Sequence, residues 1–170
     1  MTSNVKKGNK KMAILREIFN ILSVEFTVML TAALPIIELK GAIPVGISLG
    51  LSPLHAFFLS FIGSLIPVPF ILILIKPIFD NLRKTKVFRA LINMLIARSF
   101  NKSNFIRKYG PLGLLIFVAL PIPGTGVWSG SLIAALLNIR YKRAFPSIII
   151  GNLISGTIVW LLSVGALSIS

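Results

Sequence analysis

Two charged residues, Glu38 and Lys40, stand in an otherwise apolar part of the chain, directly before Gly41 and Pro44. Glycine loosens a helix and proline removes one of its donors, so these residues predict a broken segment. A charge at the centre of a bilayer costs about 3 kcal/mol, and such residues therefore pair, face a cavity or mark an ion path. Glu38 is our first candidate for a carboxylate that binds a proton or a cation. The alternative places both charges at the outer membrane interface, among headgroups and water.

A second group of candidates lies in the sequence Pro121-Ile122-Pro123-Gly124-Thr125-Gly126, which cannot form the interior of a helix. A helix that begins near Gly126 would direct its free backbone N–H groups into the turn, and these groups form an anion site. We expect this site to face Glu38 or Lys40. Trp128 directly follows the turn and is positioned to line a pocket. The predicted transport, substrate or ion path consists of Glu38, Lys40, Gly41, Pro44, Pro121, Pro123, Gly124, Thr125, Gly126 and Trp128.

The composition predicts that these residues lie in a membrane. Of the 170 residues, 55% are hydrophobic and only 13% are charged, whereas about 25% are charged in soluble domains. Four acidic residues, one histidine and no cysteine leave little material for a metal site or a nucleophile. We therefore expect no enzyme, no metal and no cofactor. The net charge of +14 indicates membrane topology rather than nucleic-acid binding.

The apolar sequence falls into stretches at residues 18–37, 45–75, 111–139 and 144–169. A helix needs about 20 residues to cross a bilayer. The stretch 111–139 is broken in its middle and has basic residues on both flanks, which favours a re-entrant hairpin that enters and leaves on one side. Two short full spans are the alternative. A cleaved signal peptide ending near Thr31 is disfavoured, because cleavage there would cut into the repeat described next.

The sequence predicts an internal repeat. Ala33-Leu34-Pro35-Ile36 recurs as Ala119-Leu120-Pro121-Ile122, and six of twelve residues are identical between 55–66 and 143–154. Each half reads as a helix, a broken turn, a short helix and a full span, with the first turn running from Pro35 to Pro44. Broken segments at matching positions of two halves are the best sequence indication of a transport site.

Clusters of basic residues set the expected orientation. Residues 1–16 and 76–108 are strongly basic, which predicts that both lie in the cytoplasm. This arrangement favours inverted halves and a C-terminus outside, although parallel halves remain an alternative. Within the connector, residues 82–97 combine apolar residues at helical spacing with basic ones. They predict an amphipathic helix on the anionic leaflet or, alternatively, a segment that only determines topology.

The two motifs around Glu38–Pro44 and Pro121–Gly130 resemble those of the putative small multidrug export protein family of bacteria and archaea. The resemblance covers nearly the whole chain beyond the basic tail and implies export of small molecules. The family is similar, more distantly, to the DedA (VTT-domain) membrane proteins, which implies paired re-entrant loops and lipid translocation driven by the proton-motive force. By this resemblance Glu38 matches an acidic residue of the first DedA loop. The second DedA loop carries arginines that this sequence lacks, which argues against phosphate-headed lipids.

These observations predict an all-α polytopic protein of the cytoplasmic membrane with two repeats, each a re-entrant hairpin plus a transmembrane helix. Its expected parts are a basic cytoplasmic tail (1–17), a first repeat (18–75), a basic connector (76–110) and a second repeat (111–170). The expected function is export of small molecules driven by an ion gradient, with translocation of a lipid or lipid carrier as the alternative. The expected partners are the anionic leaflet (through residues 76–108), a small-molecule or lipid substrate, H⁺ or Na⁺, and a second copy in a homodimer, but no nucleic acid.

Overall fold

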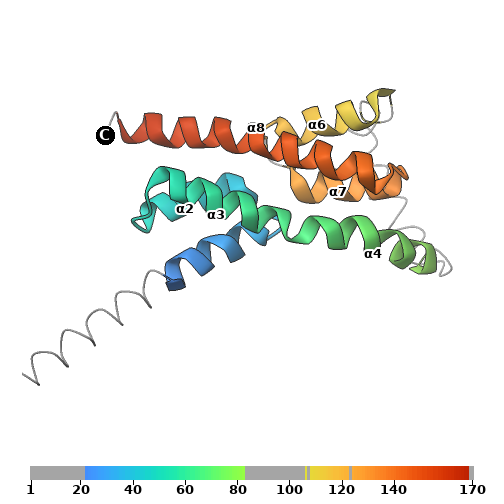
Figure 1. Ribbon diagram of the computed structural model, residues 1–170, viewed down its shortest axis with the longest axis horizontal. Helices are drawn as coiled ribbons and strands as arrows, with labels where there is room; N and C mark the ends of the chain where they lie inside the picture. The colour runs from blue at the N-terminus through green and yellow to red at the C-terminus, as the bar shows by residue number, and fades with distance from the viewer. Residues whose placement is uncertain (1–21, 83–105, 107, 123, 169–170) are drawn as a thin grey trace, which may run out of the picture.

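The described part of the chain is entirely helical. The computed structural model describes residues 22–82, 106, 108–122 and 124–168, and within them it contains helices and turns but no β-strand. Figure 1 shows the arrangement. The helices are Leu22–Ala33, α2 (Glu38–Ser48), α3 (Pro53–Leu65), α4 (Pro67–Leu82), α6 (Pro111–Ala119), α7 (Val127–Leu136) and α8 (Tyr141–Leu167).

Two helical segments are long and apolar enough to cross a membrane. Pro53–Ile75, which combines α3 with most of α4, has a mean hydropathy of 2.5, and Tyr141–Ala166 in α8 has one of 1.9. Only 28% of the most apolar window of each segment is buried in the protein. The remaining apolar surface therefore needs a lipid environment. The two segments run antiparallel along the long axis of the molecule (Figure 1), and they agree with the expectation of an all-helical membrane protein.

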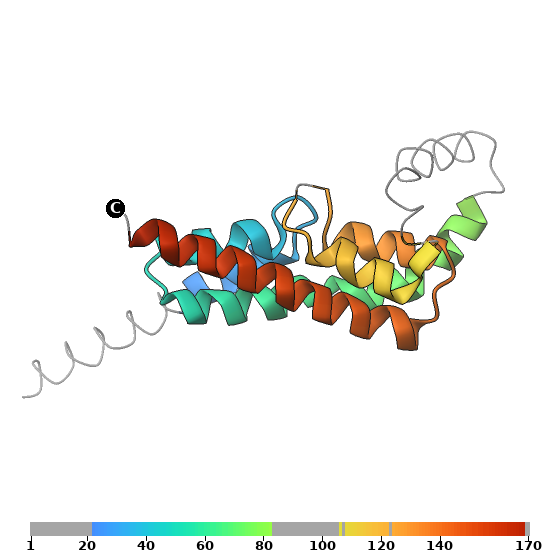
Figure 2. The ribbon, with the colours of Figure 1, turned by 90° about the horizontal axis from the view of Figure 1, so that it is seen from above.

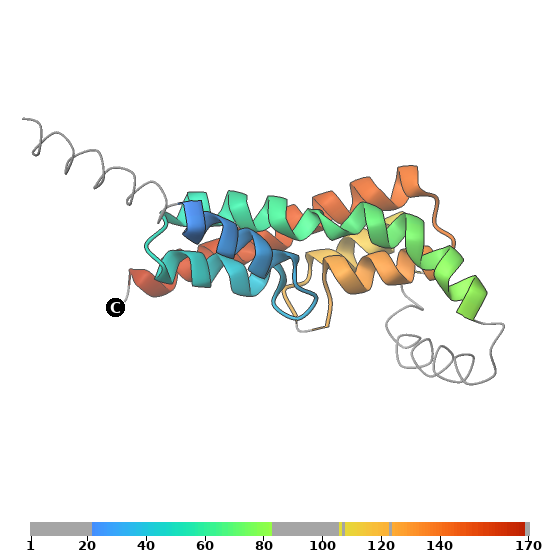
Figure 3. The ribbon, with the colours of Figure 1, turned by 90° about the horizontal axis from the view of Figure 1, so that it is seen from below.

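The other helices form two short hairpins. Leu22–Ala33 turns into α2, and α6 turns into α7; the two turns lie side by side halfway along the molecule and project from the same face (Figures 2 and 3). Since α6 has 9 residues and α7 has 10, each is only about 15 Å long at 1.5 Å per residue. Neither can cross a hydrocarbon core of about 30 Å. Helices of this length favour the re-entrant hairpin over the alternative of two full spans within 111–139.

The break in the first hairpin is shorter than the sequence suggested. The turn comprises only residues 34–37, and α2 already begins at Glu38. The prediction that the broken segment extends to Pro44 was wrong, since Pro44 lies inside α2. A single proline removes one helix hydrogen bond, and the neighbouring bonds are enough to continue the helix.

Both hairpins are joined to the long segments by the same kind of turn. After α2, the Leu51 N–H donates to Gly46 O and the Gly50 N–H to Ile47 O; after α7, residues 139 and 138 donate to residues 134 and 135 in the same way. These paired bonds form a Schellman motif, which requires a left-handed residue just after the helix. Gly50 (φ +91°) and Asn138 (φ +55°) take that position. Each turn reverses the chain and starts the following long segment.

Helices approach most closely where glycine faces backbone. Gly63 of α3 lies against the Met29 carbonyl of the first helix, and Gly151 of α8 lies against the Leu115 carbonyl of α6. Between the two long segments, the Asn152 side chain donates to Ser64 Oγ at 2.8 Å. A cluster of buried side chains from α4, α6, α7 and the start of α8 forms the largest part of the core, and it includes Val68, Leu114, Val118, Val127 and Ile148.

Several predicted features lie outside the described residues. These are the tail 1–17, the first residues of the apolar stretch 18–37, and nearly all of the amphipathic helix predicted for 82–97. The helix α4 continues to Leu82, beyond the apolar stretch that ends at Ile75.

The glycine crossings predict a difference between two substitutions in α8. At Gly151 an added Cβ would lie 2.6 Å from Leu115 O, whereas nothing lies within 4 Å at Gly165. Overpacking costs about 1–3 kcal/mol, and alanine is favoured over glycine in a helix by up to about 1 kcal/mol. We expect Gly151→Ala to lower the melting temperature of the detergent-purified protein, and Gly165→Ala to leave it unchanged or raise it. Equal melting temperatures for the two variants would contradict the close packing of α6 on α8.

Candidate functional site

The site is built around Glu38, the first residue of α2. Its side chain points to the place where the two hairpin turns meet, and the residue is only 5% exposed. The backbone of Glu38 has φ +52°, a left-handed conformation that non-glycine residues rarely adopt. Such strained conformations cost about 1–3 kcal/mol and persist only where the surroundings hold them. The contacts of the carboxylate provide that support.

The Glu38 carboxylate binds to the N-terminus of α7. The Trp128 backbone N–H donates to Oε1 at 3.1 Å. The first N–H groups of a helix have no partner within it and carry a partial positive charge, so they stabilise an anion there. Gly126 precedes α7, and a Cβ at this position would overlap the carboxylate. Glycine is therefore required at position 126 for the Glu38 carboxylate to approach the N-terminus of α7.

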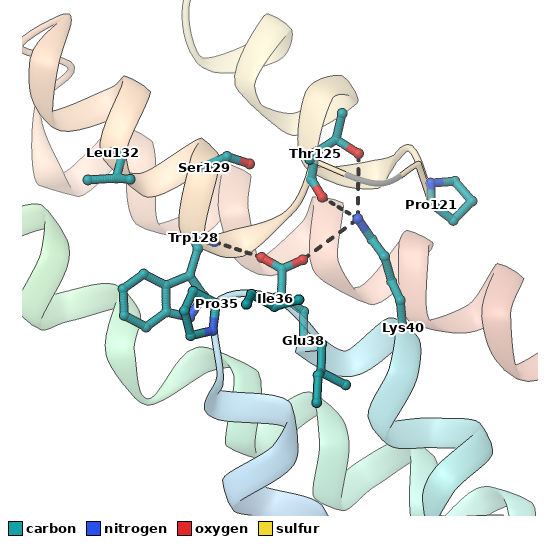
Figure 4. A pocket seen from close by; sticks show the side chains of 11 residues that line it. Pro35, Ile36, Glu38, Lys40, Pro121, Thr125, Trp128, Ser129 and Leu132 are labelled. Carbon is teal, nitrogen blue, oxygen red and sulfur yellow. Dashed lines mark hydrogen bonds and ion pairs between the residues drawn. The ribbon is translucent and has the colours of Figure 1, made fainter. Parts of the chain in front are cut away.

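Lys40 connects the carboxylate to the turn between α6 and α7 (Figure 4). Its Nζ lies 3.7 Å from Glu38 Oε2 and donates to Ile122 O at 3.1 Å and to Thr125 O. The Thr125 hydroxyl oxygen is 3.5 Å from the same Nζ. That hydroxyl lies 2.7 Å from both Leu120 O and Ile122 O, to one of which it donates. Its oxygen therefore acts as an acceptor toward the ammonium.

Trp128 joins α7 to the end of the first helix. Its indole Nε1–H donates to Ala33 O at 3.0 Å, at the last residue of the first helix. The backbone of Trp128 thus binds Glu38 while its side chain binds Ala33. Both contacts join α7 to the hairpin formed by Leu22–Ala33 and α2.

A pocket of about 400 Å³ opens beside these charges. This volume lies within the range of small-molecule sites, about 300–1,000 Å³. Its wall combines apolar side chains with the Glu38–Lys40 pair, and Figure 4 shows the residues around it. The lining residues are Pro35, Ile36, Ile37, Glu38, Lys40, Pro121, Gly124, Thr125, Trp128, Ser129 and Leu132. Among the described residues, no group of three or more His, Cys, Asp or Glu residues lies close enough to hold a metal ion.

A family model described as putative small multi-drug export protein matches residues 38–158. The matched segment begins at Glu38, directly after the first hairpin turn (residues 34–37), and includes the turn between α6 and α7. The chain belongs to this family. No curated protein and no solved structure matches the chain. The family description names an export protein, which is not a class of enzyme, and an exporter agrees with the apolar helical segments described above.

The structure brings most of the predicted site residues together. Glu38, Lys40, Pro121, Gly124, Thr125 and Trp128 line the pocket, and Gly126 lies against the Glu38 carboxylate. Gly41 does not line the pocket and instead packs against Ile37. Pro44 lines a separate apolar groove between α2 and α8. Pro123 lies outside the described residues.

Sequence reasoning missed five lining residues: Pro35, Ile36, Ile37, Ser129 and Leu132. A signal for Leu132 was present, because it follows the predicted site residue Trp128 by four positions, the spacing of one helix face. Glu25, the acidic residue within the apolar stretch 18–37, lies away from the pocket. It pairs with His55 of α3, with Oε1 and Nε2 3.2 Å apart.

The contact between Gly126 and Glu38 can be tested against a second glycine. Gly126 (φ +142°) and Gly50 (φ +91°) both have positive φ, but nothing lies within 4 Å of a Cβ at Gly50. Gly50→Ala therefore carries the backbone strain alone, of order 1–3 kcal/mol, whereas Gly126→Ala also displaces the carboxylate. We expect the larger loss of melting temperature for Gly126→Ala.

When Glu38 is replaced by Ala, the loss of melting temperature caused by Gly126→Ala should fall toward the loss caused by Gly50→Ala, because the overlapping carboxylate is gone. An unchanged penalty in the double variant would show that Glu38 does not occupy the space beside Gly126.

Proposed function

We propose that this chain is an ion-coupled exporter of small molecules in the cytoplasmic membrane, with the pocket at the two hairpin turns as its transport site. The observation that carries the proposal is the Glu38–Lys40 pair, held between two interruptions of the helices beside an apolar pocket. Broken helices are tolerated at membrane depth only where protein or a cavity shields them. Ionisable residues at that depth usually mark an ion or substrate path.

Several observations support the interpretation of the chain as two repeats. Residues 88 positions apart in sequence occupy matching places: α3 begins at Pro53 and α8 at Tyr141, and the turns at Gly50 and Asn138 share one hydrogen-bond pattern. The crossings of Gly63 on Met29 and of Gly151 on Leu115 also correspond. Each half would contribute one re-entrant hairpin and one span.

The orientation of the halves supports an inverted repeat. α3 and α4 run opposite to α8, and the two hairpins point toward each other from opposite ends of the molecule (Figures 1 and 2). Two pairs of matching positions also touch each other: Ser64 with Asn152 and Glu38 with Gly126. Matching residues meet in this way along a two-fold axis, and inverted repeats place such an axis in the membrane plane, at the transport site.

The course of residues 22–82 predicts on which side of the membrane the ends of the chain lie. After the first hairpin, residues 22–82 run once along the long axis through α3 and α4, so the first helix and the end of α4 lie toward opposite ends of the molecule (Figure 1). We expected an even number of crossings between the basic segments 1–16 and 76–108, and the described residues supply a single one. With nine basic residues between Lys76 and Lys108, we place the connector in the cytoplasm. The ends at Leu22 and Ser168 then lie outside.

Translocation of a lipid is the second candidate, because a specific groove favours it. An apolar groove of about 480 Å³ lies between α2 and α8 and is lined by Pro44, Ile47, Ser48, Val159, Leu162, Ser163 and Ala166. Such a groove is suited to an acyl chain. The two candidates differ in what the reconstituted protein moves across the bilayer.

The exporter proposal is tested with proteoliposomes under an imposed pH or Na⁺ gradient, with ethidium and a fluorescent phospholipid as alternative cargoes. We expect gradient-driven accumulation of ethidium by the wild type and its loss in Glu38→Gln, which deletes the charge but keeps the size. Glu38→Asp should retain part of the flux. Glu25→Gln is the control and should reduce the flux only slightly, because Glu25 lies away from the pocket. Movement of the phospholipid without ethidium would favour the second candidate, and equal flux in Glu38→Gln and wild type would exclude Glu38 as the coupling group.

The topology is tested with single cysteines, since the natural chain contains none. Leu49 lies at the turn between α2 and α3, and Arg140 at the turn between α7 and α8, and both are exposed. We expect an impermeant maleimide to label Leu49→Cys in intact cells and Arg140→Cys only after permeabilisation. Labelling of both from the same side would contradict the inverted arrangement.

A further inference from the structure

Four oxygen acceptors lie around the Lys40 ammonium. Two are backbone carbonyls, Ile122 O at 3.1 Å and Thr125 O; the others are Thr125 Oγ1 at 3.5 Å and Glu38 Oε2 at 3.7 Å. Three of the four come from the turn between α6 and α7, where the chain is not helical. The Thr125 hydroxyl directs its proton to Leu120 O or Ile122 O, so its lone pairs face the ammonium.

These four oxygens could also serve as ligands of a free cation. Carbonyl oxygens of unwound segments, together with hydroxyl and carboxylate oxygens, replace the hydration shell of Na⁺ or K⁺ in membrane proteins. The single carboxylate supplies one negative charge, which one monovalent cation neutralises. Divalent ions usually recruit more carboxylates, and within the described residues no cluster of acidic or histidine side chains accompanies Glu38.

We propose that the Lys40 ammonium is the tethered occupant of a monovalent-cation site, and that a compact free cation binds there when the lysine side chain moves aside. The free cation is an alkali metal ion or a primary ammonium, since both fit the same oxygens. This inference deepens the proposed function, because it assigns the class of the coupling ion and rests on the pocket being the transport path.

The pocket gives the exchange a physical route. Lys40 and Thr125 both line the pocket of about 400 Å³, and the Lys40 side chain is 17% exposed. A cation can therefore approach the oxygens from the pocket, and the displaced side chain has space beside them. Exchange of one cation for another keeps the Glu38 carboxylate paired, which avoids the cost of an unpaired buried charge.

The direct test is Lys40→Ala, which removes the tethered ammonium and keeps the oxygens. The melting temperature of the detergent-purified variant is measured against NaCl, KCl, ethylammonium chloride and choline chloride at constant ionic strength. A ligand that binds the folded state raises the melting temperature with its concentration. We expect such a rise with Na⁺, K⁺ or ethylammonium and none with choline, which is too bulky for the site. The three responses separate a metal ion from an organic amine.

Matched variants define the site. In the wild type, half-saturation should require about tenfold or more cation, because the lysine occupies the site most of the time. Lys142→Ala, at an exposed position at the start of α8, should respond like the wild type. Lys40→Ala combined with Glu38→Gln leaves the carbonyls but no charge, and it should lose the response.

If Lys40→Ala does not remain folded in choline chloride, we expect Na⁺, K⁺ or ethylammonium to restore a monodisperse protein. Failure of all three cations to stabilise or recover Lys40→Ala, or an equal effect of choline, would overturn the inference. Binding is measured without transport. Loss of the cation response with intact Glu38-dependent flux therefore rejects only the cation site, and a clear response without flux rejects only the exporter.

Discussion

The bond between the Glu38 carboxylate and the N-terminus of α7 is the interaction on which the centre of the molecule depends. It joins the first hairpin to the second, 90 residues apart in sequence. The carboxylate is nearly buried, and an unpaired charge there would cost about 3–5 kcal/mol. Backbone N–H groups and the Lys40 ammonium together offset that cost. The strained backbone of Glu38 is held by the same contacts.

This bond explains why both hairpins must be interrupted where they are. Within a helix, backbone N–H groups are free to bind a side chain only in the first turn and carbonyls only in the last turn, whereas both are free outside helices. α7 must therefore begin beside Glu38, and the chain before it must be unwound to present Ile122 O and Thr125 O to Lys40. The short lengths of the helices follow from this requirement. The long segments behind them supply the rigid frame.

The sequence predicts the parts of this site that depend on residue type. Proline and glycine mark the turn at 121–126, and Glu38 is conspicuous as a charge in apolar sequence. It does not predict partners that are backbone atoms, since a carbonyl is present at every position and its availability depends on the fold. The partners of Lys40 are of this kind. The first break was placed too far along the chain for a related reason: Pro44 lowers helix stability, but packing against neighbouring helices keeps it helical.

In the repeat that we propose, the positions of Glu38 and Gly126 correspond and touch each other. The same residue type at both of these positions would be unfavourable. Two glutamates would bring two carboxylates together, and like charges in contact repel each other. Two glycines would leave the N-terminal N–H groups of α7 without an anion. A carboxylate from one half facing a glycine from the other resolves both problems, since the glycine supplies the space and its helix supplies the donors. A repeat with a charged centre must therefore differ between its halves where they meet on the axis, as Glu38 and Gly126 do.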